Sequence, residues 1–312
     1  YIRIELFFHG VLMRVFLTGG TGFIGHYVAK ALLNRGHELH ISTRHPEKIP
    51  SLAKEKNVTF FKGALTDTEI LQQAIQNCDA CIHIALGWGE TPTTMLKNDT
   101  LATATLLELA AQAGCKKFIY TSSTAAMGQM RPSMAETCVN LPVDLYGATK
   151  SAGEAFVLGF RQQNLKRNII RPGYTFGNPA YSDGCSQPDT RFKKIAEAAL
   201  RNDPIHIIKN DGTQFIHASQ QAEVFCRLLE SDLNEEIFLA LGQTWISWKE
   251  IAEQAIALVP NCKSEIIEED LGWSDSPMTF SVRKLSEVLG LQFDSRPFIS
   301  PHIQYYLDML KK

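Results

Sequence analysis

Short apolar runs alternate with longer amphipathic segments through the first half of this 312-residue chain. The apolar runs have the length of buried strands, and the amphipathic segments repeat their apolar positions at helical spacing. This alternation predicts an α/β fold with a doubly wound parallel sheet. The expected strands are 15–17, 38–42, 58–62, 80–85, 118–121 and a sixth that ends at 171–173, and the expected helices are 27–35, 67–75, 96–113 and 146–160.

After residue 173 the pattern becomes less regular and more helical. A loop rich in Ser, Asp, Gly and Pro covers 181–188. We expect the strand at 236–240 to rejoin the main sheet. The other expected elements are a strand at 205–208 and helices at 191–201, 220–229, 248–258, 285–289 and 299–310.

Composition and charge narrow the functional classes. The formal net charge is −2, so no basic footprint for nucleic acid or a membrane surface is present. The 7 cysteines are scattered, which favours free thiols in a reducing, cytoplasmic compartment. Cys78 and Cys81 form a C-x-x-C, but no second pair has metal-ligand spacing, so we expect core thiols and no metal.

Three glycines separate the first strand from the first helix. Gly19, Gly22 and Gly25 follow one another at intervals of three. Such a turn leaves free backbone N–H groups at the positive end of a helix, where they hold a phosphate. The spacing favours a dinucleotide site that includes Phe23 and Ile24, and the alternative is an ordinary tight turn.

The end of the second strand bears on the choice of cofactor. An acidic residue here would bind the ribose hydroxyls of NAD. This chain has Thr43 followed by Arg44, whose guanidinium can bind a 2′-phosphate. We therefore expect NADP, with NAD as the alternative. Arg44 could also be a solvated loop charge.

Hydroxyl and phenol groups follow the fifth strand. Ser123 lies in a Thr-Ser-Ser-Thr run at the strand end, which borders the ligand crevice of an open α/β sheet. Tyr146 and Lys150 are four apart and share one helix face. An ammonium near Tyr146 would lower the pKa of the phenol and suit it to acid/base chemistry. A capping turn and an exposed helix pair are the alternatives.

With these motifs together, the chain resembles the extended short-chain dehydrogenase/reductase family, of the NAD(P)-dependent epimerase/dehydratase type. The matching stretches are Thr18-Gly-Gly-Thr-Gly-Phe-Ile-Gly25, Gly63-Ala-Leu-Thr-Asp67, Ile82-His-Ile-Ala85, Tyr120-Thr-Ser-Ser123, Tyr146-x-x-x-Lys150 and Arg171-Pro-Gly173. The resemblance implies a catalytic triad of Ser123, Tyr146 and Lys150. It also implies cofactor contacts from Leu65, Ala85, Tyr146, Lys150, Arg171, Pro172 and Gly173.

Two departures from the family pattern concern the ligands. Ala64 stands where an aspartate usually lies near the adenine. Nucleotide-sugar members usually carry a diphosphate-binding arginine in a Gln-x-Arg-x-Phe stretch, whereas Gln214 here runs directly into Phe215. A buried diphosphate without a cation is costly, so we expect a smaller substrate.

The resemblance also predicts the domain organisation. We expect a Rossmann-type NAD(P)-binding domain at 13–172 plus about 206–242. A smaller, mostly helical substrate-binding domain would take about 173–205 plus 243–312. Separately, Met13 leads straight into the first strand, so we expect residues 1–12 to be a non-native extension. Candidate substrate contacts are Tyr174, Phe176, Asn178, Arg191, residues 86–88 and Met127, each of which could equally be core; His83 and His217 are expected to be structural.

These observations favour an NAD(P)-dependent oxidoreductase that transfers hydride to or from a small carbonyl or hydroxyl substrate. One alternative is a sugar-nucleotide epimerase or dehydratase that uses bound NAD(P). Another is a non-catalytic NADP-binding redox sensor, although such relatives usually lack the Tyr-Lys pair. A family-typical homodimer would pair the helices at 96–113 and 146–160.

Overall fold

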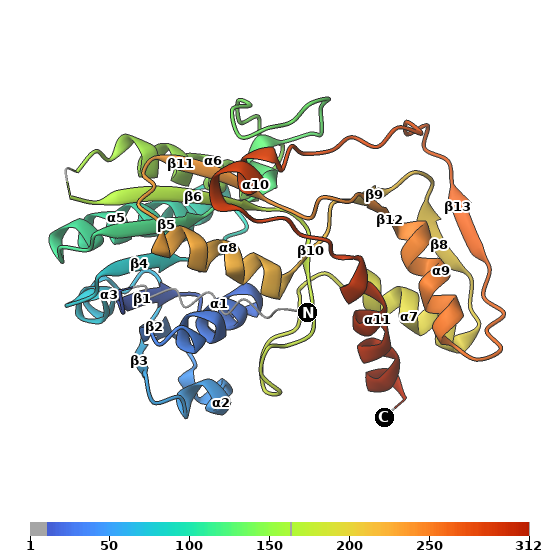
Figure 1. Ribbon diagram of the computed structural model, residues 1–312, viewed down its shortest axis with the longest axis horizontal. Helices are drawn as coiled ribbons and strands as arrows, with labels where there is room; N and C mark the ends of the chain where they lie inside the picture. The colour runs from blue at the N-terminus through green and yellow to red at the C-terminus, as the bar shows by residue number, and fades with distance from the viewer. Residues whose placement is uncertain (1–10, 163, 312) are drawn as a thin grey trace, which may run out of the picture.

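The computed structural model describes residues 11–162 and 164–311. Within these residues, seven parallel strands form one sheet in the order β11-β6-β5-β4-β1-β2-β3 (Figure 1). The doubly wound sheet is confirmed, and the strand at 236–240 rejoins it. The strands are β1 (Arg14–Thr18), β2 (Glu38–Thr43), β3 (Val58–Lys62), β4 (Ala80–His83), β5 (Lys117–Thr121), β6 (Lys166–Pro172) and β11 (Glu236–Ala240).

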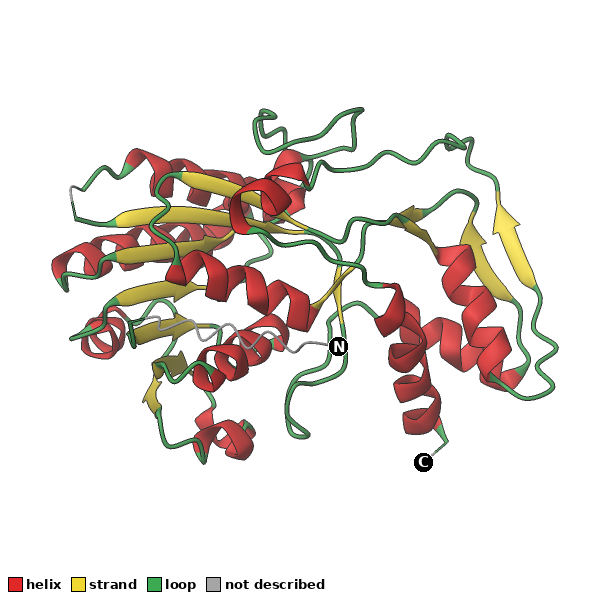
Figure 2. Cartoon of the chain, in the orientation of Figure 1, coloured by secondary structure: helices red, strands yellow, loops and turns green. Residues whose placement is uncertain are grey.

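Helices cover both faces of the sheet (Figure 2). Successive strand residues point to opposite faces, so Val15 and Leu17 pack into one apolar cluster and Phe16 into another. The first face is covered by α1 (Phe23–Asn34), α8 (Ala218–Glu230) and α10 (Arg283–Leu289). The second is covered by α3 (Thr68–Ile75), α5 (Ala102–Gln112) and α6 (Leu145–Gly159).

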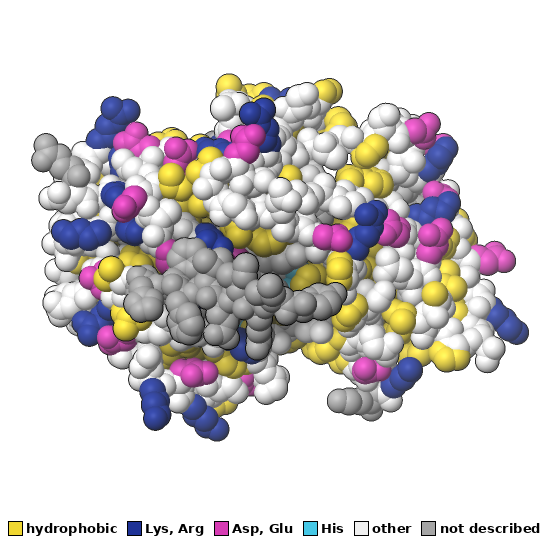
Figure 3. Space-filling model, in the orientation of Figure 1, with side chains coloured by type: hydrophobic (Ala, Val, Ile, Leu, Met, Phe, Trp, Pro, Cys, Tyr) yellow, Lys and Arg dark blue, Asp and Glu magenta, His cyan; other side chains and the backbone are white. Residues whose placement is uncertain are grey.

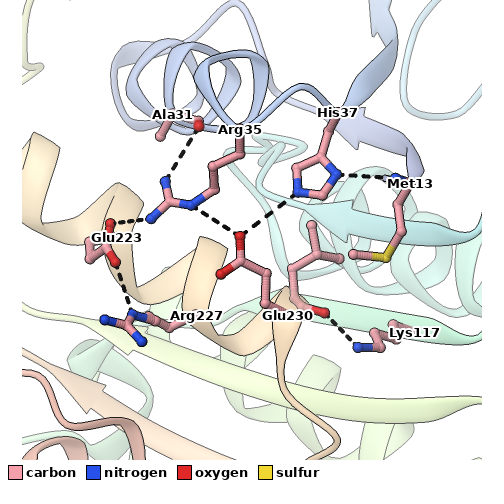
Figure 4. Close-up of polar contacts among 9 residues, drawn as sticks. Met13, Ala31, Arg35, His37, Lys117, Glu223, Arg227 and Glu230 are labelled. Carbon is pink, nitrogen blue, oxygen red and sulfur yellow. Dashed lines mark hydrogen bonds and ion pairs between the residues drawn. The ribbon is translucent and has the colours of Figure 1, made fainter. Parts of the chain in front are cut away.

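Ion pairs join the C-terminal end of α1 to α8 (Figure 4). Arg35 binds Glu223 through Nη2 at 2.5 Å and Glu230 through Nε at 3.0 Å. Arg227 also binds Glu223, at 3.1 Å. Because these side chains are only partly buried, each pair adds modest stability. Together with the apolar contacts beneath them, they anchor the helix that begins at the glycine turn.

A second lobe lies beside the carboxyl edge of the sheet (Figure 1). It contains α7 (Arg191–Arg201), α9 (Trp248–Leu258), α11 (Arg296–Leu310) and a parallel pair of β8 (Ile205–Ile208) and β13 (Ile266–Glu269). Aromatic rings fill its core, which includes Phe176, Phe192, Phe215 and Trp248. Two short pairs lead into it: β7 (Thr175–Phe176) with β10 (Ile216–His217), and β9 (Gly212–Thr213) with β12 (Ile246–Ser247).

Several elements differ from the sequence-based expectation. The first helix begins at Phe23 rather than at 27, because the carbonyl of Gly22 already accepts a hydrogen bond from the N–H of His26. The helix expected at 96–113 is a composite of α4 (Pro92–Met95), a π-helix η2 (Leu96–Leu101) and α5. Three short helices were not expected: η1 (Pro46–Lys48), α2 (Pro50–Ala53) and η3 (Thr124–Met127).

The domain boundaries stay a prediction, but the contacts refine where they would fall. β8 pairs with β13, which had not been expected, and not with the main sheet. Leu285 of α10 packs in the core cluster of the first sheet face rather than in the second lobe. Residues 1–10 of the expected extension lie outside the described residues. In the described part of the chain, the helices are too short or too polar to cross a membrane.

Candidate functional site

The glycine turn forms an open cradle at the start of α1. A side chain on Gly19 would meet the backbone N of Ala85 at 2.6 Å, and one on Gly25 would meet the carbonyl O of Gly19 at 1.9 Å. These two glycines are therefore required for packing. A side chain on Gly22 would meet only the Gly19 carbonyl, at 3.3 Å, and would otherwise project into the open space above the turn.

That open space lies where the glycine pattern predicts a dinucleotide pyrophosphate. Phe23 and Ile24 begin α1, and no acidic residue occupies its first turn. The free N–H groups and the helix dipole favour an anion at this position.

The expected adenine end of the site is shaped by the ends of β2 and β3. The hydroxyl groups of Thr21 and Thr43 lie 3.2 Å apart, which joins the glycine turn to β2. Arg44 follows as an exposed cation, and Leu65 is half-buried after β3. Ala85 donates its N–H to the hydroxyl of Thr18 at 3.3 Å, so the loop after β4 is held against the glycine turn.

The three expected catalytic residues meet at the carboxyl edge of the sheet. Ser123 follows β5 and caps η3 by accepting the N–H of Ala125 at 3.1 Å. Asp144 caps α6 by accepting the N–H of Gly147 at 2.6 Å. The cap places Tyr146 in the first turn, and Lys150 one turn further has its Nζ 6.0 Å from the centre of the Tyr146 ring.

Burial is the largest influence on the pKa of Tyr146 and on that of Lys150. Burial raises the pKa of Tyr146, a hydrogen bond with Ser123 opposes that rise, and the carboxylates of Asp99 and Asp144 add to it. The net shift of the Tyr146 pKa is thus upward, and the expected lowering by the Lys150 ammonium stays a prediction. Burial also lowers the pKa of Lys150, while Asp99 raises it.

Asp99 is a site residue that the sequence reasoning missed. It lies in η2, is fully buried, and places its Oδ2 3.7 Å from Nζ of Lys150. Its only sequence signal is an aspartate on the apolar face of a helix, in line with the buried Thr103 and Leu106. Such a signal cannot name the partner, because Lys150 is 51 residues away.

Arg171 is held inside the protein instead of projecting toward a ligand. Its guanidinium donates to both carboxylate oxygens of Glu154, at 2.8 and 2.7 Å, and to the carbonyl of Glu136 at 3.2 Å. Ser122 and Asn140 also donate to Glu154, at 2.5 and 2.7 Å. This network supports the strand ends below the site. A cofactor contact from residues 171–173 thus stays a prediction. Because the Arg171 side chain is occupied, the contact would come from Pro172, Gly173 or the backbone of this segment.

The proposed substrate residues differ in burial and in their contacts. Phe176 and Met127 are fully buried in separate apolar clusters, which favours a packing role for both. Asn178 is bonded to His302 at 2.7 Å. Leu86 and Trp88, after β4, are exposed.

Arg191 lines a cavity of about 300 Å³ in the second lobe. Its guanidinium lies 4.4 Å from the ring centre of Trp248 and 5.0 Å from that of Tyr174. Arg191 also binds Asp189 at 2.9 Å and lies 3.9 Å from Asp211, so its charge is already balanced.

Other candidate residues have structural roles. His83 lies 2.7 Å from the hydroxyl of Thr18 and 2.9 Å from that of Thr103, and burial lowers its pKa to about 3. His217 caps α8 and stacks on Phe298 at 4.2 Å. Cys78 and Cys81 are buried free thiols with raised pKa values. No group of three or more potential metal ligands occurs among the described residues.

Comparison with known protein families agrees with this geometry. The model of the NAD dependent epimerase/dehydratase family matches residues 15–240. The chain belongs to this family. The match covers the glycine cradle, the three expected catalytic residues and β11, and family membership makes a nicotinamide dinucleotide the cofactor class.

Individual members of the epimerase/dehydratase family resemble the chain over different spans. A 3-beta-hydroxysteroid dehydrogenase from Mycolicibacterium neoaurum is 32% identical over 206 residues, or 61% of this chain and 52% of the relative. The chain thus spans about half the length of that relative. A UDP-N-acetyl-alpha-D-glucosaminuronate decarboxylase from Bacillus cytotoxicus is 27% identical over 81% of this chain and 82% of the relative.

Solved structures show the same fold. A UDP-glucuronic acid 4-epimerase from Bacillus cereus, in complex with NAD, superposes with a TM-score of 0.80 at 20% identity. The superposition covers 96% of this chain and all of the epimerase chain.

Proposed function

We propose that this family member is an NADP-dependent oxidoreductase that acts on a small carbonyl or hydroxyl substrate. The meeting of Ser123, Tyr146 and Lys150 beside the glycine cradle is the observation that supports it most. The nicotinamide cofactor would supply or accept the hydride. Ser123 would orient the substrate oxygen, Tyr146 would exchange a proton with it, and Lys150 would bind the ribose.

The preference for NADP rests on Arg44. In the described part of the chain its guanidinium makes no ion pair, so it is available to a 2′-phosphate. Thr43 beside it brings no carboxylate that would repel such a phosphate.

Loss of the phenol tests the proposed chemistry. Tyr146→Phe should lower NADPH-linked turnover by about 10²–10⁴-fold, because proton transfer in the transition state is lost. The assay follows NADPH absorbance over a panel of ketones, aldehydes and alcohols. Tyr305→Phe, on α11, is the matched control and should retain activity. Wild-type turnover that survives Tyr146→Phe would overturn the proposal.

The second candidate function is sugar-nucleotide epimerisation or decarboxylation. The Bacillus cytotoxicus decarboxylase supports it, because that relative is matched over most of both chains. Two features weigh against a diphosphate: the side-chain NH₂ of Gln214 is occupied by the carbonyls of Gly242 and Phe280, and Arg191 is paired with Asp189. Conversion of UDP-glucuronic acid without net change in NADPH absorbance would favour this candidate.

A cofactor-binding sensor is the third candidate. It would bind NADPH without turnover on either panel. The intact Tyr146 and Lys150 favour an enzyme instead.

We also propose a homodimer through η2 and α6. Exposed apolar side chains gather on these elements: Leu96, Leu101, Leu145 and Phe156. Such a surface is typical of an interface between subunits.

On the face drawn in Figure 3, basic and acidic side chains are interspersed, which fits the near-neutral net charge.

A further inference from the structure

A buried carboxylate lies behind the catalytic pair. Asp99 is 0% exposed and Lys150 is 3% exposed, and Oδ2 of Asp99 lies 3.7 Å from Nζ of Lys150. Burying a carboxylate is costly unless a cation compensates it. Within the described residues, Lys150 is the cation that Asp99 contacts as an ion pair.

The second oxygen of Asp99 binds the loop after β4. Its Oδ1 accepts the N–H of Gly87 at 3.0 Å. The loop is pressed against η2, since a side chain on Gly87 would meet the carbonyl O of Asn98 at 1.9 Å. The amide of Asn98 also donates to the carbonyl of Trp88, at 2.8 Å. One carboxylate therefore joins the catalytic lysine to the loop that carries Ala85 and the proposed substrate contacts.

The π-helix accounts for the position of this carboxylate. η2 occupies Leu96–Leu101, between the α-helical segments α4 and α5. A π-turn changes the direction in which its side chains project and often marks a functional site. Here Asp99 and Thr100 are the buried residues of the turn.

We propose that Asp99 is a positioning residue that holds the Lys150 ammonium behind Tyr146 and couples it to loop 85–89. This inference rests on the proposed roles of Tyr146 and Lys150. Asp99 neutralises the ammonium, so the phenolate form of Tyr146 gains less from Lys150 than the Tyr-Lys spacing alone would provide. This charge balance agrees with the raised pKa of Tyr146.

The charged and titratable groups around the pair define the expected pH effect. α6 carries Tyr146 itself and Glu154, and Glu154 forms an ion pair with Arg171 of β6. Tyr120 of β5 lies under Lys150 at 5.3 Å, and His83 of β4 is neutral because burial holds its pKa at about 3. Asp144 is at the N-terminus of α6. Of these groups, Asp99 is the carboxylate in ion-pair contact with Lys150.

The test is Asp99→Asn, which removes the negative charge and keeps the side-chain shape and the acceptor for Gly87. Without that charge the phenolate of Tyr146 is less disfavoured, so the pKa of Tyr146 should fall by about one unit. This pKa is measured in the cofactor-free protein by following tyrosinate absorbance as the pH is raised. The part of the titration that disappears when Tyr146→Phe is added belongs to Tyr146. The low-pH limb of alcohol oxidation should move to lower pH by the same amount.

Glu108→Gln is the control, because it neutralises an exposed carboxylate on the adjoining α5. It should titrate like the wild type. A folded Asp99→Asn protein with the wild-type titration would overturn the proposal.

A second pair of variants covers the case in which Asp99→Asn does not fold. Lys150→Met leaves the Asp99 carboxylate buried without a cation, so adding Asp99→Asn to it should raise Tm by about 2–4 °C. A double variant no more stable than Lys150→Met would contradict the pairing.

These readouts separate this inference from the proposed function. A titration shift without turnover on any substrate would leave the positioning role intact and remove the oxidoreductase. Turnover that depends on Tyr146, with no shift of the Tyr146 pKa in Asp99→Asn, would support the oxidoreductase and overturn the positioning role of Asp99.

Discussion

At the residue scale, Arg44 and His26 lie near the glycine turn in opposite surroundings, one exposed and one buried. Arg44 lies exposed at the end of β2, where its charge is available to a ligand. His26 lies one turn into α1 and is fully buried against Tyr181. The first is an available charge, and the second is a group that the fold keeps neutral.

Arg44→Ala should weaken NADPH binding by about 10–100-fold, because a charge-assisted pair with the 2′-phosphate is lost. NADH binding should change little. Fluorescence titration of both cofactors measures the ratio, with Lys56→Ala, an exposed cation further along the chain, as the control. Equal weakening of both cofactors would exclude the 2′-phosphate role.

The buried His26 should make stability fall in mild acid. Burial lowers its pKa to about 4, from 6.5 in the unfolded chain. Its contribution is therefore complete above pH 6.5 and is lost as the pH falls toward 4, by about 2 kcal/mol between pH 7 and pH 5. The free energy of unfolding, measured with urea at the two pH values, should fall from pH 7 to pH 5. This fall should be smaller in His26→Leu than in the wild type by about 2 kcal/mol. The exposed His206→Gln should keep the full drop, and an unchanged drop in His26→Leu would refute the account.

At the scale of elements, α6 organises the site by its spacing. Tyr146, Lys150 and Glu154 follow at intervals of four, so they lie along one face of the helix. They contact Ser123, Asp99 and Arg171 respectively, which belong to three other elements. The N-cap at Asp144 fixes where this face begins. Helix geometry therefore aligns the tyrosine and the lysine that are expected to be catalytic with the glutamate that binds Arg171.

Two helix-capping side chains allow the effect of the α6 cap on the position of Tyr146 to be separated from its effect on stability. Asp144→Ala in α6 and Ser247→Ala in α9 each remove a side chain that accepts an N–H three residues on, at 2.6 and 3.0 Å. Each should cost about 1 kcal/mol in the free energy of unfolding. Only Asp144→Ala should also lower kcat, because Tyr146 lies in the first turn of its helix. Equal kcat in both variants would show that the cap does not position the site.

At the scale of the whole molecule, the candidate site lies at the carboxyl edge of the sheet, beside the second lobe (Figure 1). The sheet domain carries the glycine cradle and the expected catalytic residues, whereas the second lobe has its own aromatic core and a cavity at Arg191 that is lined by residues of that lobe. On the sheet domain, exposed apolar residues lie on η2 and α6, including Leu101 at 57% and Phe156 at 52% exposed. A dimer formed there would bury the outer surfaces of the elements that carry Asp99 and Tyr146.

Phe156→Glu should convert the proposed dimer to a monomer, because a charge would be buried at the apolar interface. Light scattering after size exclusion measures the mass. Val288→Glu, at a 46% exposed position on α10, should leave the mass of the wild type unchanged. A wild-type monomer, or a dimer that persists in Phe156→Glu, would contradict the interface.

What the sequence by itself determined is local. The strand and helix pattern, the glycine cradle and the Tyr146–Lys150 face depend on spacings of a few residues. Backbone geometry converts such spacings into structure directly, and they identified the fold and the family.

Only the tertiary structure decided the rest. It brought Asp99 to Lys150, committed Arg171 to Glu154, and paired β13 with β8. These contacts join residues 17 to 61 positions apart, and burial sets the strength of the two ion pairs. A local pattern shows a polar residue among apolar ones, but the energetic need for its partner arises only when folding removes both from water.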